Sequence, residues 1–195
     1  RSLSLTRSKT FLERKTKMKK ILAVAAVLCM VSAASATVAL SVDGPYDNGL
    51  VAGTVTYDLH AVITGERYQS HEIDASLTAG TFYQDGFGGF VAPNPLFIPS
   101  FPALAFDSYV TTPYDYPNVD DPAVTGAATP GSTEGAAAMS GGIFVAGNTA
   151  IDGDFVLVRL TVSADAEGTA TGRVITTENL SGYDYSITIP EPGTL

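Results

Sequence analysis

Alternating apolar and polar positions recur through the chain after residue 36 and predict strands with one buried face. In residues 51–64 the odd positions are mostly apolar, whereas the even positions are mostly polar. The same two-residue period returns in residues 70–79 and again in residues 183–189. Because side chains of a strand point alternately to its two faces, these stretches predict three half-buried strands.

Residues 155–163 are more uniformly apolar, which is typical of a central strand covered on both faces. A short turn is expected at residues 164–168, followed by a further strand at residues 169–177. No stretch after residue 36 carries a convincing 3.6-residue apolar repeat, and threonine, valine and tyrosine are abundant. The sequence therefore predicts an all-β antiparallel sandwich of jelly-roll or immunoglobulin/cohesin-like type. Residues 134–139, with three alanines, are the one weak helical candidate.

Two segments fit poorly into a minimal sandwich. Residues 82–116 hold ten of the eighteen phenylalanines and tyrosines and are rich in proline, and residues 112–142 are rich in Gly, Ala, Pro, Thr and Asp. Irregular connections longer than about 12–15 residues are uncommon in compact domains and tend to be functional or mobile. Any binding site is therefore expected in these segments.

The charge is divided very unevenly along the chain. Eight of the eleven Lys and Arg residues lie in the first twenty positions, whereas residues 37–195 hold three arginines, no lysine and nineteen acidic residues, a formal charge of −16. A body this acidic repels phosphate backbones and anionic lipid surfaces. Nucleic-acid binding and electrostatic docking on a membrane are therefore excluded as functions.

The N-terminal region has the features of an export signal. Residues 1–17 are polar and basic, so we expect them to be translated sequence upstream of an initiator at Met18. Residues 18–36 combine two lysines, an eleven-residue apolar stretch and a small-x-small site at Ala34 and Ala36, which predicts a signal helix cleaved by signal peptidase before Thr37. The alternative, a transmembrane anchor, is disfavoured because an apolar helix of eleven residues, at a rise of 1.5 Å each, is too short to cross a ~30 Å hydrocarbon core.

The single cysteine, Cys29, lies inside this signal. Lipid attachment is disfavoured because Leu28 stands where lipoprotein signals have a small residue. No cysteine follows, which excludes disulfides, cysteine nucleophiles and thiolate metal sites from the exported part. An exported domain without disulfides depends on its apolar core, and 159 residues are enough for one.

The candidates for catalysis are few. Asp58 and His60 lie two residues apart on one face of a predicted strand and could share a proton or a ligand. A hydrolase would also need an activated nucleophile, and the chain has no G-x-S-x-G motif. His71 beside Glu72 is expected to be structural or solvated, and the two histidines have no zinc-site spacing. We therefore expect no enzymatic activity.

Calcium is the metal best suited to the loop carboxylates, and no other cofactor is expected. The preferred ligands are Asn148, Asp152 and Asp154, which precede the central strand predicted at residues 155–163. Two other clusters qualify less well: Asp43, Asp47 and Asn48, and Asp115, Asp120 and Asp121. The alternative is that Asp, Asn and Gly are ordinary turn residues, since none of the clusters matches a calcium-loop motif.

The aromatic segment suggests a platform on which sugar rings of a polysaccharide could stack. Tyr114 and Tyr116 flank Asp115 in a predicted loop and are the preferred pair for a glycan site. The alternative is that the aromatic residues belong to the core, because tryptophan, the largest stacking surface, is missing from the chain.

The tail carries the most specific motif. Pro190, Glu191 and Pro192 follow the last predicted strand directly, and Gly193 and Thr194 come next. This arrangement, behind a signal peptide, resembles the PEP-CTERM family of exported bacterial proteins. The resemblance implies an apolar membrane span and a basic cluster after the triplet, and processing by an exosortase. We expect residues 190–195 to be the start of a truncated sorting signal, so that the membrane is reached only through a missing C-terminal anchor.

The expected protein is thus a sandwich domain, residues 37–189, between an export signal and a sorting signal. Its expected role is that of a secreted or surface-sorted, non-enzymatic component of the extracellular matrix or envelope of a Gram-negative-type bacterium. The alternative is a carbohydrate- or calcium-dependent adhesion module. A third hypothesis is a secreted hydrolase that uses Asp58 and His60.

Overall fold

The computed structural model describes residues 36–113, 126–128, 131–145 and 150–190. The chain divides into two units between Ser35 and Ala36, and all described residues belong to the second unit. The predicted upstream segment, the signal helix and Ala34 therefore lie outside the described residues. The signal helix and the cleavage site stay predictions.

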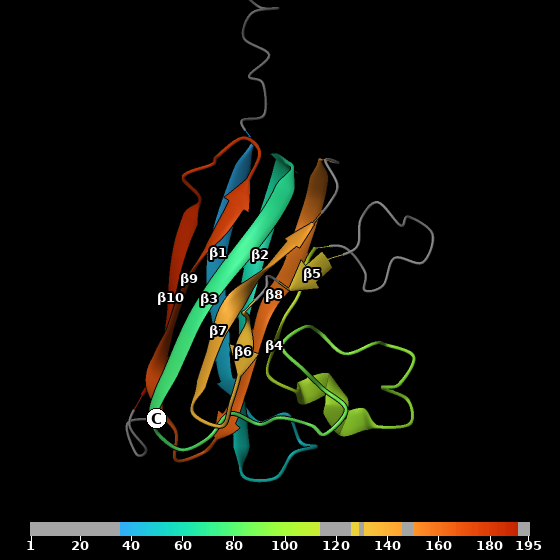
Figure 1. The fold of residues 1–195 in the computed structure, drawn as a ribbon, viewed down its shortest axis with the longest axis vertical. Coiled ribbons are helices and arrows are strands. Elements are labelled where there is room, and N and C mark those ends of the chain that lie inside the picture. The colour runs from blue at the N-terminus through green and yellow to red at the C-terminus, as the bar shows by residue number, and fades with distance from the viewer. Residues whose placement is uncertain (1–35, 114–125, 129–130, 146–149, 191–195) are drawn as a thin grey trace, which may run out of the picture. The chain divides into compact units, whose positions relative to one another are not determined.

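The described residues form two antiparallel β-sheets, seen as two layers in Figure 1. The first sheet has the strand order β1-β2-β8-β4, and the second has the order β10-β9-β3-β7-β5, with β6 pairing on β7. The first sheet contains β1 (Thr37–Tyr46), β2 (Thr54–Glu66), β8 (Ile151–Ser163) and β4 (Tyr109–Val110). The second contains β10 (Tyr183–Ile189), β9 (Glu167–Thr176), β3 (Tyr68–Ala79), β7 (Ala138–Val145), β5 (Gly126–Ala128) and β6 (Thr133–Glu134). This confirms the predicted all-β antiparallel sandwich.

The core lies between the two sheets and is built from the apolar positions of the alternating strands. Leu59 and Ile63 of β2 are fully buried, and Ile187 and Ile189 of β10 are each only 1% exposed. Burying a side chain of this size contributes about 1.5–3 kcal/mol, and the exposed alternate positions of β10 are polar. The hydrophobic effect therefore sets which face of each strand points inward.

Strand β8 is one of the two inner strands of the first sheet, as its uniform apolar run predicts. It pairs with β2 on one side and with β4 on the other. Its inner face joins the core, and its outer face is partly covered by the connection between β3 and β4, where Ser108 Oγ donates to the carbonyl of Thr161 at 2.9 Å. This connection, residues 80–108, is called the aromatic lobe below and appears in green to yellow-green at one side of Figure 1.

The only helix of the described residues is a 3₁₀ helix in the aromatic lobe, η1 (Pro102–Phe106). Proline at its first turn suits a helix start, because the missing N–H would have no intrahelical partner there. Within the described part of the chain, no helix has the length and hydropathy needed to span a membrane.

The weak helical candidate at residues 134–139 is not a helix. Residues 133–134 and 138–145 form β6 and β7, which pair with each other through Thr133 and Ser140. Strand β7 also pairs along most of its length with β3, and it buries Met139 and Ile143 in the core. The weak helical preference of three alanines is overridden by this sheet pairing and burial.

Candidate functional site

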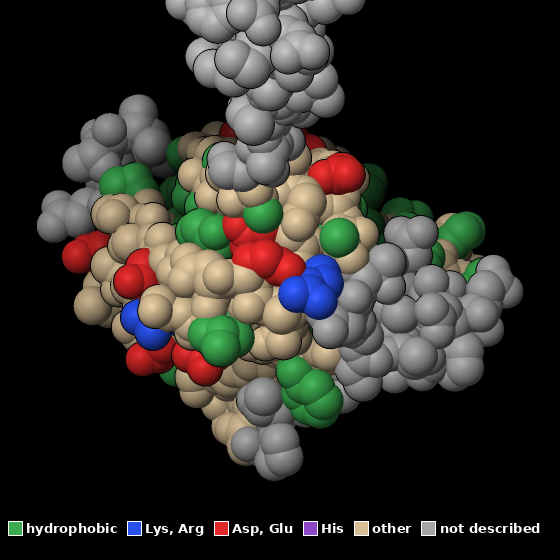
Figure 2. Space-filling model, turned by 90° about the horizontal axis from the view of Figure 1, so that it is seen from above, with side chains coloured by type: hydrophobic (Ala, Val, Ile, Leu, Met, Phe, Trp, Pro, Cys, Tyr) green, Lys and Arg blue, Asp and Glu red, His purple; other side chains and the backbone are tan. Residues whose placement is uncertain are grey.

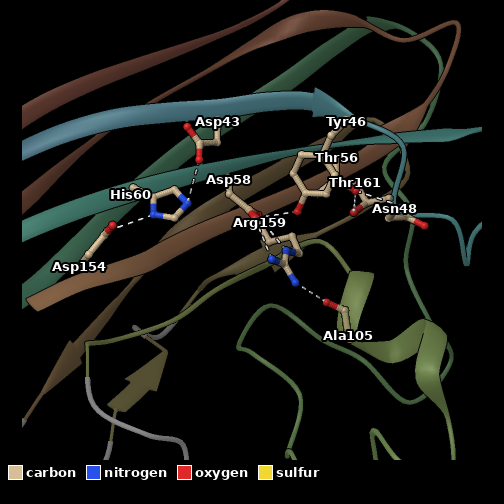
Figure 3. Close-up of polar contacts among 10 residues, drawn as sticks. All are labelled: Asp43, Tyr46, Asn48, Thr56, Asp58, His60, Ala105, Asp154, Arg159 and Thr161. Atoms are coloured by element: carbon tan, nitrogen blue, oxygen red, sulfur yellow. Dashed lines mark hydrogen bonds and ion pairs between the residues drawn. The ribbon is translucent and has the colours of Figure 1, made fainter.

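A cluster of polar and charged side chains lies on the outer face of the first sheet, where β1, β2 and β8 run side by side (Figure 3). It is called the outer-face cluster here. Its members are Asp43 and Tyr46 of β1, Asp58 and His60 of β2, and Asp154 and Arg159 of β8. Three strands that are distant in sequence thus contribute to one small area.

A one-residue bulge in β8 sets which side chains reach this face. Leu59 pairs with Val158, but the next residue, His60, pairs with Val156. The skipped residue reverses the alternation along β8, so Arg159 and Asp154 both face outward although one position is odd and the other even. Bulges of this kind re-aim side chains and occur often beside functional sites.

Asp58 and Arg159 form the centre of the cluster and face each other across the strand pair. The Arg159 guanidinium donates to both carboxylate oxygens of Asp58, at 2.8 and 2.7 Å, and donates to the carbonyl of Ala105 at 2.7 Å. The hydroxyl of Tyr46 donates to the same carboxylate at 2.7 Å. Burial is the main cause that raises the pKa of Tyr46 to about 12, and the hydrogen bond to Asp58 is the second. Tyr46 therefore keeps its proton and remains a donor.

The burial of Asp58 differs from the polar, exposed face that alternation predicts for β2. Only 5% of Asp58 and none of Thr56 is exposed. The aromatic lobe covers this part of the sheet: Ala105 contacts Arg159, and Ser108 contacts Thr161, which in turn bonds Thr56 at 2.9 Å. The side of the strand was predicted correctly, but a distant segment removes it from water.

His60 lies between two carboxylates from different strands. Its Nδ1 is 3.0 Å from Asp154 Oδ1, and its Nε2 is 3.5 Å from Asp43 Oδ2. The His60 side chain is 24% exposed, whereas Asp43 is 71% and Asp154 is 59% exposed. Water therefore screens this array far more than it screens Asp58 and Arg159.

The chemistry available to these groups is limited. Among the described contacts, both ring nitrogens of His60 meet carboxylates and none meets a hydroxyl that could act as a nucleophile. Asp58 bonds Arg159 and Tyr46 rather than His60. A catalytic triad needs a nucleophile, a base and an orienting acid in one chain of bonds, and this arrangement supplies the base and acids alone.

The second histidine of the chain is a core residue. His71 is 1% exposed, and its Nε2 lies 2.9 Å from the hydroxyl of Tyr185, which donates to the carbonyl of Glu72 at 3.0 Å. Burial lowers the pKa of His71 to about 3, so the ring is neutral at physiological pH. Of the two expected roles, structural or solvated, this position fits the structural one, and the Glu72 side chain points to the exposed face of β3.

The described residues of the predicted calcium site, Asp152 and Asp154, contact different partners in the structure. Asp152 Oδ1 accepts the N–H of Gly65 at 2.7 Å, Asp154 contacts His60, and Asn148 lies outside the described residues. No group of three or more His, Cys, Asp or Glu side chains within the described ranges is placed to hold a metal ion. The calcium site stays a prediction.

The residues of the other two candidate calcium clusters were also compared with their contacts in the structure. Asp47 and Asn48 accept backbone N–H groups within their own turn, as Asp and Asn commonly do, and Asp43 contacts His60. The cluster of Asp115, Asp120 and Asp121 lies outside the described residues. The same holds for Tyr114 and Tyr116 of the predicted glycan site and for Glu191 and Pro192 of the predicted sorting motif.

Sequence reasoning missed Arg159, although the signal was present. Arg159 is the single charged residue in the apolar run of β8, and a cation at such a position needs a buried counter-charge. Two buried carboxylates were also missed, Glu66 and Asp107, which are 1% and 0% exposed. Nothing in their local sequence separates them from the other acidic residues.

The aromatic lobe provides a second candidate area. Several of its large apolar side chains are exposed, namely Phe87 (70%), Leu96 (81%), Phe97 (54%) and Phe101 (42%). The rings of Phe87 and Phe101 pack on each other with centroids 4.8 Å apart. A hollow of about 400 Å³ is lined by residues of this segment, namely Phe87, Gly88, Gly89, Val91, Ala92, Pro93, Asn94 and Phe97. By contrast, Phe82 and Phe90 of the same segment belong to the core.

No protein-family model matches this chain, and no curated protein matches it. Function is therefore inferred from the chain's own residues. The relevant features are the outer-face cluster, the aromatic lobe, the surface charge and the two predicted sorting motifs.

Proposed function

We propose that this chain is an exported, non-enzymatic β-sandwich protein of the surface or extracellular matrix of a bacterium. The observation that carries the proposal is the placement of the strands. Strand β1 begins at Thr37, directly after the predicted cleavage site, and β10 ends at Ile189, directly before Pro190 of the Pro-Glu-Pro triplet. The sandwich thus spans the interval between the two sorting motifs.

The charge distribution supports an exported and soluble domain. Each of the three arginines after residue 36 pairs with a carboxylate: Arg67 with Glu178, Arg159 with Asp58, and Arg173 with Asp184. In Figure 2 the basic side chains in view lie beside acidic ones. The large excess of acidic groups therefore has no cation to neutralise it, and neighbouring copies repel one another.

The partners of His60 and Asp58 favour a role without catalysis. His60 contacts two carboxylates, and Asp58 is committed to Arg159 and Tyr46. These contacts join β1, β2 and β8, and Arg159 extends them to the aromatic lobe through the carbonyl of Ala105. This is a structural use of polar groups. The processing partners in this proposal are signal peptidase and an exosortase.

Expression of the full chain in a Gram-negative host tests export. We expect a mature protein that begins at Thr37, identified by mass spectrometry, in the periplasm or medium. An uncleaved cytoplasmic protein, or a lipidated one beginning at Cys29, would contradict the proposal.

Surface sorting needs a separate experiment. The reading frame after Leu195 in the source DNA is expected to continue through about twenty apolar residues into a basic cluster. In a host with an exosortase, replacing Pro190, Glu191 and Pro192 by alanine in that longer chain should leave the protein unprocessed. Unchanged processing and surface display of the variant would refute the sorting assignment and leave export intact.

A second candidate function, carbohydrate-dependent adhesion, is favoured by the exposed rings of the aromatic lobe. Flat aromatic faces beside a hollow suit stacking of neutral sugar rings. Affinity electrophoresis in gels containing xylan, dextran or laminarin is expected to slow the protein, and Phe97→Ala should abolish the effect. Leu180→Ala, an exposed apolar residue outside the lobe, is the matched control. Migration unaffected by all three polysaccharides would exclude this function for those glycans.

A further inference from the structure

The aromatic lobe and the neighbouring strand β8 border a groove made of two adjoining hollows. The 400 Å³ hollow described above shares Ala92 and Pro93 with a second hollow of about 330 Å³. The second hollow is lined by the lobe and also by Asp154 and Val156 of β8. The two hollows together, called the lobe groove here, therefore connect the exposed rings of the lobe with Asp154 of the outer-face cluster.

One end of the lobe groove carries exposed phenyl rings. Phe87 and Phe97 line it and are 70% and 54% exposed. The ring of Phe87 packs on that of Phe101, with centroids 4.8 Å apart, so this ring is supported on one side while much of it faces water. Large apolar side chains gathered on a surface often mark a binding site. These rings suit a ligand that has flat apolar faces, such as a sugar ring.

The other end of the lobe groove is acidic. His60 lies between Asp43 and Asp154, with one ring nitrogen near each carboxylate (Figure 3). Because two carboxylates share one imidazole, this array keeps a net negative charge even when the ring is protonated. Asp154 is 59% exposed, and its Oδ2 has no hydrogen-bond partner among the described residues. This oxygen is therefore available to a cation bound in the groove.

The backbone of the lobe groove offers a ligand few hydrogen-bond donors. The N–H groups of Ala92 and Thr111 already donate to backbone carbonyls. Three lining residues have no N–H group, namely Pro93, Pro95 and Pro113. An extended peptide that binds along a protein backbone needs such donors, whereas the hydroxyl and amino groups of a sugar need acceptors such as Asp154. The groove therefore favours a polysaccharide over a peptide.

The charge of the domain selects among polysaccharides. Residues 37–195 carry a formal charge of −16, and each of their three arginines already has a carboxylate partner. An acidic polysaccharide is repelled by such a body. A neutral one gains nothing from the charge of Asp154, whereas an ammonium group forms a charge-assisted hydrogen bond with a carboxylate.

We propose that the lobe groove binds a polysaccharide that carries free amino groups, with sugar rings stacked on Phe87 and Phe97 and an ammonium group at Asp154. This inference rests on the carbohydrate-dependent candidate function and names the class of glycan for it. Neutral glycans use the phenyl rings alone and bind the same groove more weakly.

Titration calorimetry of the intact chain with two hexasaccharides tests this inference. One is the hexamer of glucosamine, in a buffer that keeps its amines protonated, and the other is the hexamer of N-acetylglucosamine, whose nitrogens carry no charge. The glucosamine hexamer is expected to bind about fivefold more tightly, the contribution of one exposed ion pair. Added salt should reduce this preference, because it screens exposed charges.

Three variants locate the two contacts. Asp154→Asn should remove the preference for the glucosamine hexamer and leave the affinity for the acetylated hexamer unchanged. Phe97→Ala should weaken the binding of both hexamers. Asp74→Asn is the matched control, because it removes the same charge from an exposed position of β3 in the other sheet, and it should leave both affinities unchanged.

Equal affinities for the two hexamers would overturn the assignment of amino groups and leave carbohydrate adhesion standing. An equal loss in Asp74→Asn and Asp154→Asn would overturn it too, because the attraction would then come from the whole acidic surface. Hexalysine binding as tightly as the glucosamine hexamer would replace the polysaccharide by a basic peptide. Failure of both hexamers, with unaffected migration in the three polysaccharide gels, would exclude both this inference and the adhesion function.

Discussion

The guanidinium of Arg159 donates hydrogen bonds to both carboxylate oxygens of Asp58 across the β2–β8 pair. The same guanidinium donates to the carbonyl of Ala105 in the aromatic lobe. Only 18% of the Arg159 side chain and 7% of the Asp58 side chain are exposed. One ion pair thus joins the centre of the first sheet to the segment that covers it.

Loss of Arg159 should be strongly destabilising, because it leaves Asp58 buried without its counter-charge. Arg159→Met is expected to lower the free energy of unfolding by about 3–5 kcal/mol. Urea denaturation measures this change. Arg173→Met is the matched control, because Arg173 is 46% and its partner Asp184 is 73% exposed, and its unfolding curve should match that of the unmodified protein. Equal effects of the two substitutions would show that the buried pair has no special role.

Gly172 of β9 is expected to tolerate no side chain. A Cβ there would lie 2.0 Å from the carbonyl oxygen of Glu72 and 2.3 Å from the hydroxyl of Tyr185, where the two groups bond each other. Gly172→Ala should cost roughly 1–3 kcal/mol through overpacking, seen as a lower thermal midpoint. Gly86→Ala, where nothing lies within 4 Å, should leave the midpoint nearly unchanged. A neutral Gly172→Ala would mean that Tyr185 can move aside freely.

His71 should make the sandwich sensitive to acid. Its pKa in the folded protein is about 3, below the ordinary 6.5, so the unfolded chain takes up a proton more readily. The stabilising contribution is complete above pH 6.5 and is lost as pH falls from 6.5 towards 3, with a slope of about 1.4 kcal/mol per pH unit.

The difference in unfolding free energy between the unmodified protein and His71→Phe isolates this effect, because other groups titrate in both proteins. We expect the difference to change steadily between pH 6.5 and pH 4. A constant difference across that range would show that His71 is protonated in the folded state.

Glu66 is a buried carboxylate that has hydroxyl donors in place of a cation. Tyr183 donates to its Oε1 at 2.5 Å, and Thr176 donates to its Oε2. Tyr183→Phe removes one donor and is expected to cost about 1–3 kcal/mol, measured by urea denaturation. Tyr83→Phe, whose hydroxyl makes a longer 3.3 Å bond to Asp85, should cost less than ~0.5 kcal/mol. Similar costs would argue that Glu66 is satisfied without Tyr183.

Much of the fold could be predicted from the two-residue period alone. The alternation at residues 70–79 corresponds to β3, where Ile73 and Ala75 are buried and Glu72 and Asp74 are exposed. The strand predicted at residues 169–177 is β9, whose observed bounds are Glu167–Thr176. The weak helical candidate at residues 134–139 failed because local alanine content says nothing about pairing with a distant strand such as β3.

The candidate site was less accessible to sequence reasoning. Asp58 and His60 were correctly placed on one face, yet they have separate partners in the structure. Asp43 and Asp154 were assigned to different clusters, and the structure brings both to His60. The strand register and the bulges decide which side chains come into contact across strands, and neither can be read from the sequence of a single strand.

By itself, the sequence determined the class of fold, the buried face of each strand with a clear two-residue alternation, and the acidity of residues 37–195. These properties depend only on composition and on the period of apolar positions. The tertiary structure decided which polar side chains leave water. Thr56, Asp58 and Asp107 are ordinary polar residues in the sequence, and they are buried because the aromatic lobe folds over them or around them. Burial of a polar group is a property of what packs against it from elsewhere in the chain, so only the folded arrangement could reveal the Arg159–Asp58 pair and the buried Asp107 carboxylate.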